Sequence, residues 1–310
     1  WEDRRPASGR RRRPGPLVEV TMITVRPGRR AALATVVAGL LALLLTGCTE
    51  PGAEPSTPPE PSSSPTETTE PSPTPETADL EVYAMTDTGT ELRLVRELRA
   101  VPDPTVEAAV ELMIVGPVDP DYVSPWNTST RVLGVTQDAG TVVVDLSADA
   151  RTANIGSAGA ALMIEQLVWT ASAAVGDPAA PVLLTIEGAP AGELWGAVVW
   201  DVPLTRSDPI SVRLLVQIDE PREGATSASP LTVSGEAAVF EATLPWRVLD
   251  TAGTEVAAGV AMTAEGQTFA PFSFTVDLEP GTYSIEITED DPSGGEGRPP
   301  MVDTRTVTIG

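Results

Sequence analysis

Residues 157–174 read SAGAALMIEQLVWTASAA, and this stretch decides the fold of the first folded domain. Its apolar residues recur every three or four positions, which is typical of an amphipathic helix. Two apolar runs of strand length flank it at residues 141–146 and 182–186. The order strand, helix, strand predicts an α+β core. The apolar face expected for the helix consists of Ala160, Ala161, Ile164, Leu167, Val168 and Ala171.

The same pattern extends over residues 79–208, which we predict to form one α+β domain in the order ββαββαβ. Alternating apolar residues at 80–84 and 92–96 predict two strands joined by a turn at Asp87-Thr-Gly89. Asp103 and Pro104 have the residue types of a helix N-cap and first position. Two helices packed on one face of a mixed sheet would cover the apolar faces. The apolar face expected for this earlier helix is Val106, Ala109, Val110, Met113 and Ile114.

Helical periodicity disappears in residues 209–310, where seven short alternating strands with regular turns predict an immunoglobulin-like β-sandwich. Trp246 is expected in its centre. Cys48 is the only cysteine of the chain, so no disulfide can join the two sheets.

The N-terminal residues predict an exported, tethered protein. Leu45-Thr46-Gly47-Cys48 closes an apolar run of 15 residues that follows three arginines, and it resembles the lipobox of bacterial lipoproteins. The resemblance implies a signal peptide at residues 22–47, cleavage before Cys48 and a diacyl chain on its sulfur. A transmembrane anchor is the alternative, although the run is shorter than the ~20 residues that a span needs.

The segments on either side of the signal peptide contain no apolar periodicity. Residues 1–21 are basic, and we interpret them as an upstream extension before a start at Met22; a nucleic-acid-binding arm is the alternative. Residues 48–78 are rich in Pro, Ser, Thr and Glu and predict a disordered linker. The linker would hold the folded part away from the membrane.

Composition excludes several kinds of site. The chain has no His and no Lys, which excludes Ser-His-Asp, Cys-His and Ser-Lys catalysis. From Cys48 onward there are 11 Arg and 41 acidic residues, within a chain of net charge −24. Such a charge repels nucleic acid. We therefore expect no nucleic-acid partner, no cofactor and no metal.

Short matches across the first domain carry a resemblance to a known family. They are Val82-Tyr83, Glu97-x-Arg99, Leu112 through Gly116-Pro117, Val143-x-Asp145-Leu146-Ser147 and Gln166-Leu-Val-Trp-Thr170. Together they resemble the GerMN domain of bacterial spore-germination and sporulation proteins, which also occurs in lipoproteins of bacteria that do not sporulate. The chain departs from the family at Trp169, where Tyr is common, and at Pro125-Trp126-Asn127-Thr128, where the family has Pro-x-Gly-Thr. The resemblance implies a module related to ring-building domains, without catalytic residues.

A second resemblance covers the C-terminal part. Its residues are Val233-x-Gly235, Phe240-Glu241-Ala242, Trp246-Arg-Val248, Gly259, Pro271-Phe272 and Asp291-Pro292. They are similar to the immunoglobulin-like domain associated with bacterial spore germination, which often follows a GerMN domain. This resemblance implies binding or assembly.

Three groups of residues are candidates for function. Carboxylates at Glu97, Asp119, Asp121 and Asp145 are the options for acid–base chemistry, and ordinary structural roles compete with it. The acidic loop 289–296 has oxygen ligands but lacks the spacing of a calcium loop. Trp126 and Tyr122, in the loop 118–130, are the candidates for a partner-binding surface.

These observations favour a lipid-anchored, extracytoplasmic lipoprotein that binds an envelope protein or peptidoglycan without catalysis. A ligand-binding accessory subunit of a membrane sensor or transporter is one alternative. A cell-wall hydrolase that uses carboxylates is the other. Self-association into a homo-oligomer is left open.

Overall fold

The computed structural model describes residues 77–153, 155–291 and 294–310. The predicted signal peptide, the Leu45–Cys48 motif and nearly all of the linker lie outside these residues and stay predictions. No helix in the described ranges is long and apolar enough to cross a membrane.

The first domain contains two α-helices and eight strands. They are β1 (Ala78–Asp87), β2 (Leu92–Val101), α1 (Val106–Val115), β3 (Val132–Asp138), β4 (Thr141–Leu146), α2 (Ser157–Ala174), β5 (Val182–Ile186), β6 (Ala189–Pro190), β7 (Gly192–Leu194) and β8 (Val198–Trp200). Strands β3, β4, β5 and β6 form a mixed sheet in this order, in which β4 and β5 are parallel. Both helices contact this sheet, which confirms the predicted α+β arrangement.

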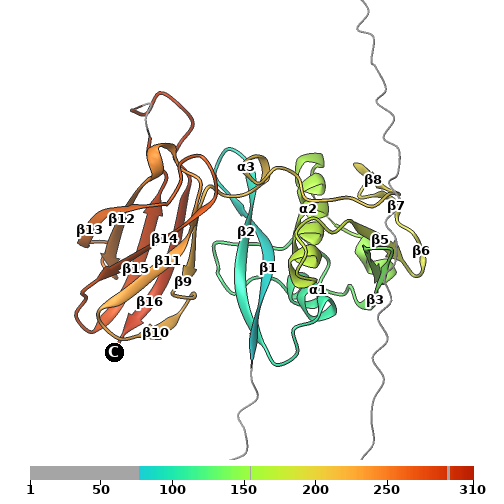
Figure 1. Ribbon diagram of the computed structural model, residues 1–310, viewed down its shortest axis with the longest axis horizontal. Coiled ribbons are helices and arrows are strands. Elements are labelled where there is room, and N and C mark those ends of the chain that lie inside the picture. Colours follow the sequence, from blue (N-terminus) through green and yellow to red (C-terminus); the bar gives the residue numbers. More distant parts are fainter. Residues whose placement is uncertain (1–76, 154, 292–293) are drawn as a thin grey trace, which may run out of the picture. The chain divides into compact units, whose positions relative to one another are not determined.

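Strands β1 and β2 do not join the mixed sheet, which is the main difference from the prediction. They form a separate antiparallel ribbon of ten residue pairs on the other side of the helices (Figure 1). Helix α2 therefore packs against strands on both sides and is buried over most of its surface. A helix buried all round needs no single apolar stripe, and the predicted face is correspondingly incomplete. Ala161 is exposed, whereas Leu162 and Met163 are buried.

Polar side chains of α2 form hydrogen bonds with the backbone of β1, on the edge of this strand that does not pair with β2. Gln166 Nε2 donates to the carbonyl oxygen of Tyr83 (2.8 Å), and the amide of Tyr83 donates to Thr170 Oγ1 (3.1 Å). Because Gln166 and Thr170 are four residues apart, they lie on the same helix face. Both backbone groups of a buried edge residue are thereby satisfied.

Helix α1 buries the face that its sequence predicts, through Ala109, Val110, Met113 and Ile114. Its N-cap differs from the prediction. The cap is Thr105, whose side chain accepts a hydrogen bond from the amide of Ala108 (3.1 Å). The helix begins at Val106, so Asp103 and Pro104 precede it rather than start it.

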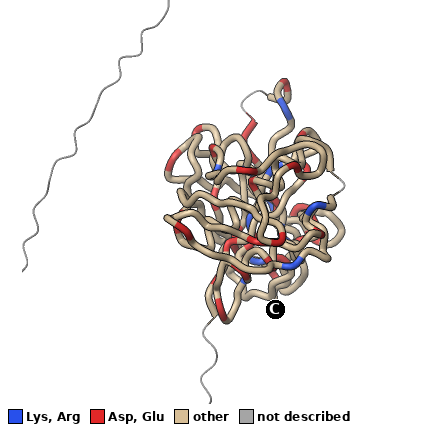
Figure 2. The backbone as a smooth tube through the Cα atoms, turned by 90° about the vertical axis from the view of Figure 1, so that its right-hand side faces the viewer, with Lys and Arg blue, Asp and Glu red and all other residues tan. Residues whose placement is uncertain are grey.

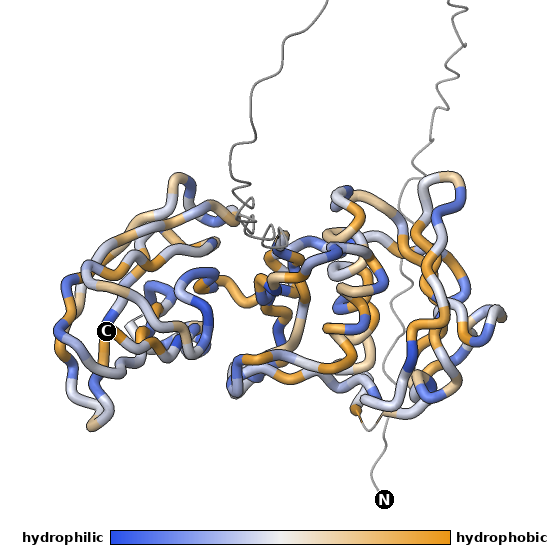
Figure 3. The backbone as a smooth tube through the Cα atoms, turned by 90° about the horizontal axis from the view of Figure 1, so that it is seen from below, coloured by the Kyte–Doolittle hydropathy of each residue, from blue (hydrophilic) through white to orange (hydrophobic). Residues whose placement is uncertain are grey.

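The second domain is the expected two-sheet sandwich. Its elements are α3 (Pro209–Val212), β9 (Val216–Glu220), β10 (Ala225–Ser227), β11 (Leu231–Ala237), β12 (Thr243–Asp250), β13 (Glu255–Met262), β14 (Ala270–Val276), β15 (Gly281–Thr288) and β16 (Val302–Ile309). One sheet has the order β10-β16-β15-β12-β13 and the other β14-β11-β9. Apolar residues, orange in Figure 3, follow the strands and helices of both domains.

The sequence predicts Trp246 at the centre of the sandwich, but the structure places it away from the centre. It is only partly buried and stacks on Phe274 of the facing sheet, with ring centroids 4.4 Å apart. Its indole also lies against Gly259, where a Cβ would come within 2.5 Å of the ring. Because Gly259 has no side chain, the Trp246 ring can lie directly against the inner face of β13.

Candidate functional site

The two domains meet at a junction that contains both apolar and charged side chains of each domain. Ala84, Val95 and Tyr122 of the first domain pack within the core of the second. The backbone is joined as well, since the amide of Leu214 donates to the carbonyl oxygen of Leu94 (2.8 Å). We call this contact region the domain junction.

A buried ion cluster crosses the domain junction. Arg305 Nη1 on β16 donates to Asp119 Oδ2 (2.6 Å) and to Asp303 Oδ1 (3.1 Å). Tyr122 donates its hydroxyl to Asp303 Oδ1 (2.6 Å). The three charged side chains are 4% exposed or less, so the cluster places two carboxylates and one guanidinium away from water. Burial of this kind requires paired charges.

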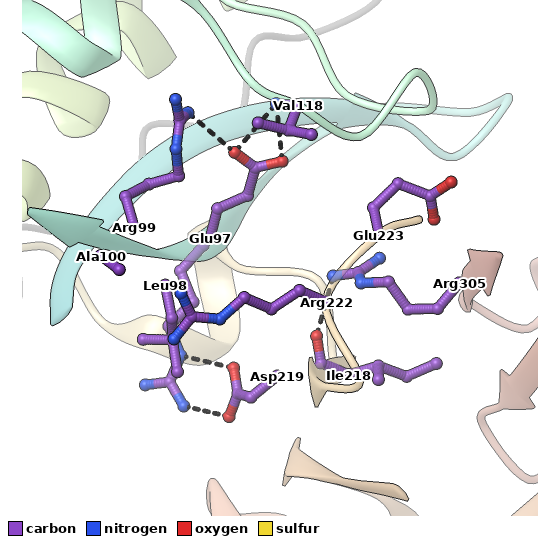
Figure 4. A pocket seen from close by; sticks show the side chains of 11 residues that line it. Glu97, Leu98, Arg99, Ala100, Val118, Ile218, Asp219, Arg222, Glu223 and Arg305 are labelled. Atoms are coloured by element: carbon purple, nitrogen blue, oxygen red, sulfur yellow. Dashed lines mark hydrogen bonds and ion pairs between the residues drawn. The ribbon is translucent and has the colours of Figure 1, made fainter. Parts of the chain in front are cut away.

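The loop before Asp119 is fixed by Glu97 of β2. The Glu97 carboxylate accepts hydrogen bonds from the amides of Val118 (2.9 Å) and Asp119 (2.8 Å). Arg99 pairs with Glu97 (3.2 Å) and donates to the carbonyl oxygen of Gly116. Both side chains point the same way along β2, as residues two apart on a strand do. Figure 4 shows Glu97 reaching the backbone at Val118.

A second ion network flanks the cluster. Arg96 on β2 binds both carboxylate oxygens of Asp219 on β9, at 3.0 and 2.6 Å. It also pairs with Glu236 on β11 (3.0 Å), which in turn pairs with Arg213 (3.1 Å). Bidentate arginine–carboxylate contacts fix geometry as well as charge. The pairing therefore sets the register of β2 against the sandwich.

A cavity of about 240 Å³ lies beside these groups, lined by residues from both domains (Figure 4). Arg96, Arg99, Arg222 and Arg305 line it together with Glu97 and Asp219. Each of these four arginines already has a carboxylate partner within 4 Å. The guanidinium groups are thus occupied by the protein itself.

Burial shifts the acid–base properties of the cluster. Desolvation raises the pKa of Asp119 to about 6, although Arg305 opposes the shift. Desolvation also raises the pKa of Asp303 and of Tyr122. Burial alone would lower the pKa of Arg305, but its anionic neighbours raise it overall. Protonation of Asp119 would leave one carboxylate facing one guanidinium, a neutral pair.

The raised pKa of Asp119 predicts a specific pH dependence of stability. The folded chain binds this proton more tightly than the unfolded chain, so stability increases as pH falls through about 6. Relative to Asp119→Asn, the free energy of unfolding is expected to rise by about 2 kcal/mol between pH 7.5 and pH 4.5. Urea unfolding of both proteins at several pH values measures this difference. Parallel pH profiles would contradict the assignment.

The structure places the predicted partner-binding residues in the interior. Tyr122 is 4% exposed and contacts the second domain. Trp126 is 3% exposed and meets Trp195 edge to face, with centroids 5.5 Å apart. The loop that carries them is folded inward, so neither ring lies on a surface. Their role towards a partner stays an untested prediction.

The four candidate carboxylates all have structural partners. Besides Glu97 and Asp119, Asp121 accepts from the Thr304 hydroxyl (2.6 Å). Asp145 accepts from the Thr185 hydroxyl (2.8 Å) and the Gly188 amide (2.9 Å). Within the described ranges no group of three or more metal-ligating residues could hold an ion. Part of the acidic loop 289–296 lies outside those ranges.

Sequence reasoning missed Arg305 and Asp303, the residues on which the junction depends. Both lie on the same face of β16 as the buried Val307 and Ile309. The available signal was that these two charged residues occupy the same alternate positions of the strand as the apolar residues that face the core. A charged side chain on a buried face needs a partner of opposite charge.

Comparison with protein families gives one match for each domain. Residues 81–192 match the model described as sporulation and spore germination, and residues 215–296 match the immunoglobulin-like domain of bacterial spore germination. The chain carries a GerMN domain followed by a spore-germination immunoglobulin-like domain. Both resemblances drawn from the sequence are confirmed. A comparison with curated proteins gave no match.

Solved structures resemble the GerMN domain at low identity. The tandem GerMN domains of the sporulation protein GerM from Bacillus subtilis are 16% identical, with a TM-score of 0.37 over 46% of this chain and 50% of that one. The first GerMN domain of the same protein is 20% identical, with a TM-score of 0.35 over 42% and 99%. A putative lipoprotein from Clostridium perfringens is 15% identical, with a TM-score of 0.31 over 44% and 93%. This chain thus spans half the length of the tandem structure.

Proposed function

We propose that this chain is a non-catalytic binding module of a bacterial cell envelope, tethered to the outer face of the membrane through lipidated Cys48. The observation that supports it best is the use of charged groups at the domain junction. Glu97, Asp119 and Asp121 each hold backbone or side-chain partners in place. An acid–base catalyst must instead reach a substrate proton.

The surface charge is consistent with a binding role. Acidic residues, red in Figure 2, are spread over the loops of the described part, and basic residues are few. Such a surface keeps the module soluble and favours partners with basic patches. One cavity at the junction, about 240 Å³, is smaller than the ~300–1,000 Å³ of most small-molecule sites, whereas a second, lined among others by Tyr83, Arg206 and Arg213, measures about 620 Å³. The acidic surface is therefore the feature that favours an envelope protein as the partner.

Cys48→Ala tests the anchor. The exchange is expected to abolish incorporation of labelled fatty acid and to release the protein from the membrane fraction, because the thioether-linked lipid is then missing. Metabolic labelling and fractionation measure both effects, and Thr49→Ala serves as the neighbouring control. A Cys48→Ala protein that remains in the membrane fraction would contradict the lipid anchor.

Crosslinking in intact cells tests the binding function. A photoreactive residue at Val123 or Leu133, 53% and 52% exposed, samples two surfaces of the GerMN domain. We expect a discrete adduct with an envelope protein from at least one position, and loss of that adduct in the Cys48→Ala background. Adducts that persist without the anchor would contradict a membrane-tethered function.

Peptidoglycan zymography tests the hydrolase alternative. The proposed function predicts no clearing by the purified chain. Clearing that disappears in Glu97→Gln or Asp121→Asn would overturn the non-catalytic assignment.

A further inference from the structure

Strand β13 presents an exposed apolar row at the margin of the second domain. Val256, Ala258, Val260 and Met262 alternate along it and are all exposed. The three larger side chains are 48%, 62% and 66% exposed. They point away from the sandwich core, since Trp246 fills the inner side at Gly259. We call these four residues the β13 row.

Among the described residues, the backbone of β13 has no strand partner on one side. The strand is the last of its sheet, and β12 is the one described strand that pairs with it (Figure 1). Free edges are normally protected by lysine, proline, inward charges or a β-bulge. The sequence EVAAGVAM contains no lysine or proline, and its single charge is Glu255 at the first position. The register against β12 shifts at Val256, so a bulge interrupts this end of the edge, and the regular apolar stretch 257–262 is the part suited to pairing with another strand.

Charge decides which strand can pair with it. The chain is strongly acidic overall, so a second copy meets less repulsion at a strand that carries one charge than at an acidic surface. The predicted linker, residues 48–78, is a poor occupant because its prolines lack the amide needed for a strand ladder. An antiparallel second β13 has no such defect and is itself apolar.

We propose that two copies of this chain pair edge to edge through β13, antiparallel and centred on Gly259. In this register Ala258 lies opposite Val260 of the second copy, and the bulged end at Val256 lies beside Met262. Each pair joins a smaller side chain to a larger one on the same face. The two Glu255 carboxylates lie eight residues apart along the ladder, roughly 27 Å. That distance exceeds the ~8 Å screening length at physiological salt.

Pairing would join two five-stranded sheets into one continuous sheet. It gives the free edge of β13 in each copy a hydrogen-bonded partner. It also places the two β13 rows side by side on the same face of the joined sheet. This inference goes beyond the proposed binding function and does not depend on the lipid anchor. The purified chain can therefore test it without a membrane or a partner.

Sedimentation of the purified full chain in mild detergent tests the pairing. We expect a reversible dimer in the micromolar range, and at least about a tenfold weaker dimer for Val260→Lys, because a lysine on the edge strand blocks pairing. Val199→Lys on β8 is the matched control, since Val199 is 65% exposed and lies in the other domain. A monomer at 100 μM, or equal dissociation constants for both variants, would overturn the proposal.

Disulfide trapping tests the register. In chains that also carry Cys48→Ser, a mixture of Ala258→Cys and Val260→Cys is expected to oxidise to a mixed dimer that reductant releases. Each variant alone is expected to remain largely uncrosslinked, because identical positions are then diagonal neighbours ~7–8 Å apart. Crosslinking of either variant with itself would overturn the register centred on Gly259, and no crosslink in any mixture would overturn pairing through β13.

Discussion

Replacing Arg305 by Met is expected to lower the free energy of unfolding by about 3–5 kcal/mol. The exchange keeps a side chain of similar length but leaves Asp119 and Asp303 buried beside each other without their shared cation. It also removes the hydrogen bond from Arg305 Nη2 to the carbonyl oxygen of Ile218 (2.8 Å). Urea unfolding at pH 7.5, followed by circular dichroism, measures the loss.

Arg247→Met is the matched control for this prediction. Arg247 also pairs with a carboxylate, Glu286 at 2.7 Å, but its side chain is 48% exposed. Exposed pairs contribute up to about 1 kcal/mol, so a small loss is expected. Equal losses for the two variants would show that the buried cluster is not what stabilises the junction.

Trp126→Ala is expected to lower the free energy of unfolding by about 3–5 kcal/mol, because it empties a large buried volume. The indole belongs to the core of the GerMN domain and packs edge to face on Trp195. Trp195 in turn donates to the carbonyl oxygen of Ala150 (3.0 Å), which holds the second ring in place. Thermal and urea unfolding measure the effect.

Trp126→Phe provides the control, since it keeps an aromatic ring in the same pocket. The indole nitrogen of Trp126 has no hydrogen-bond partner within the described structure. The loss in free energy of unfolding for Trp126→Phe is therefore expected to be less than half of the loss for Trp126→Ala. A Trp126→Ala protein as stable as the unaltered chain would contradict the interior placement and favour a surface role.

Local patterns predicted the parts of the fold that depend on near neighbours. Glu97 and Arg99 are two residues apart on a strand, so their pairing could be expected before the structure was known. Gln166 and Thr170 are four residues apart and therefore share a helix face, but no local pattern indicates the strand that they hold. Strand alternation likewise predicted the sandwich, because a period of two is visible in each strand.

Features that depend on distant residues could not be predicted. The β1–β2 ribbon forms a separate sheet because α2 is apolar on both sides, which a search for one apolar stripe overlooks. Arg305 and Asp119 are 186 positions apart, and no local pattern connects them. Trp126 looked exposed because it lies in a loop, yet this loop folds into the core.

The domain junction is expected to join the GerMN and immunoglobulin-like domains into one cooperative unit. Differential scanning calorimetry of the unaltered chain and of Arg305→Met tests it most directly. We predict one transition for the unaltered chain, with equal calorimetric and van't Hoff enthalpies, and two separated transitions for Arg305→Met. Two independent transitions in the unaltered chain would contradict the claim.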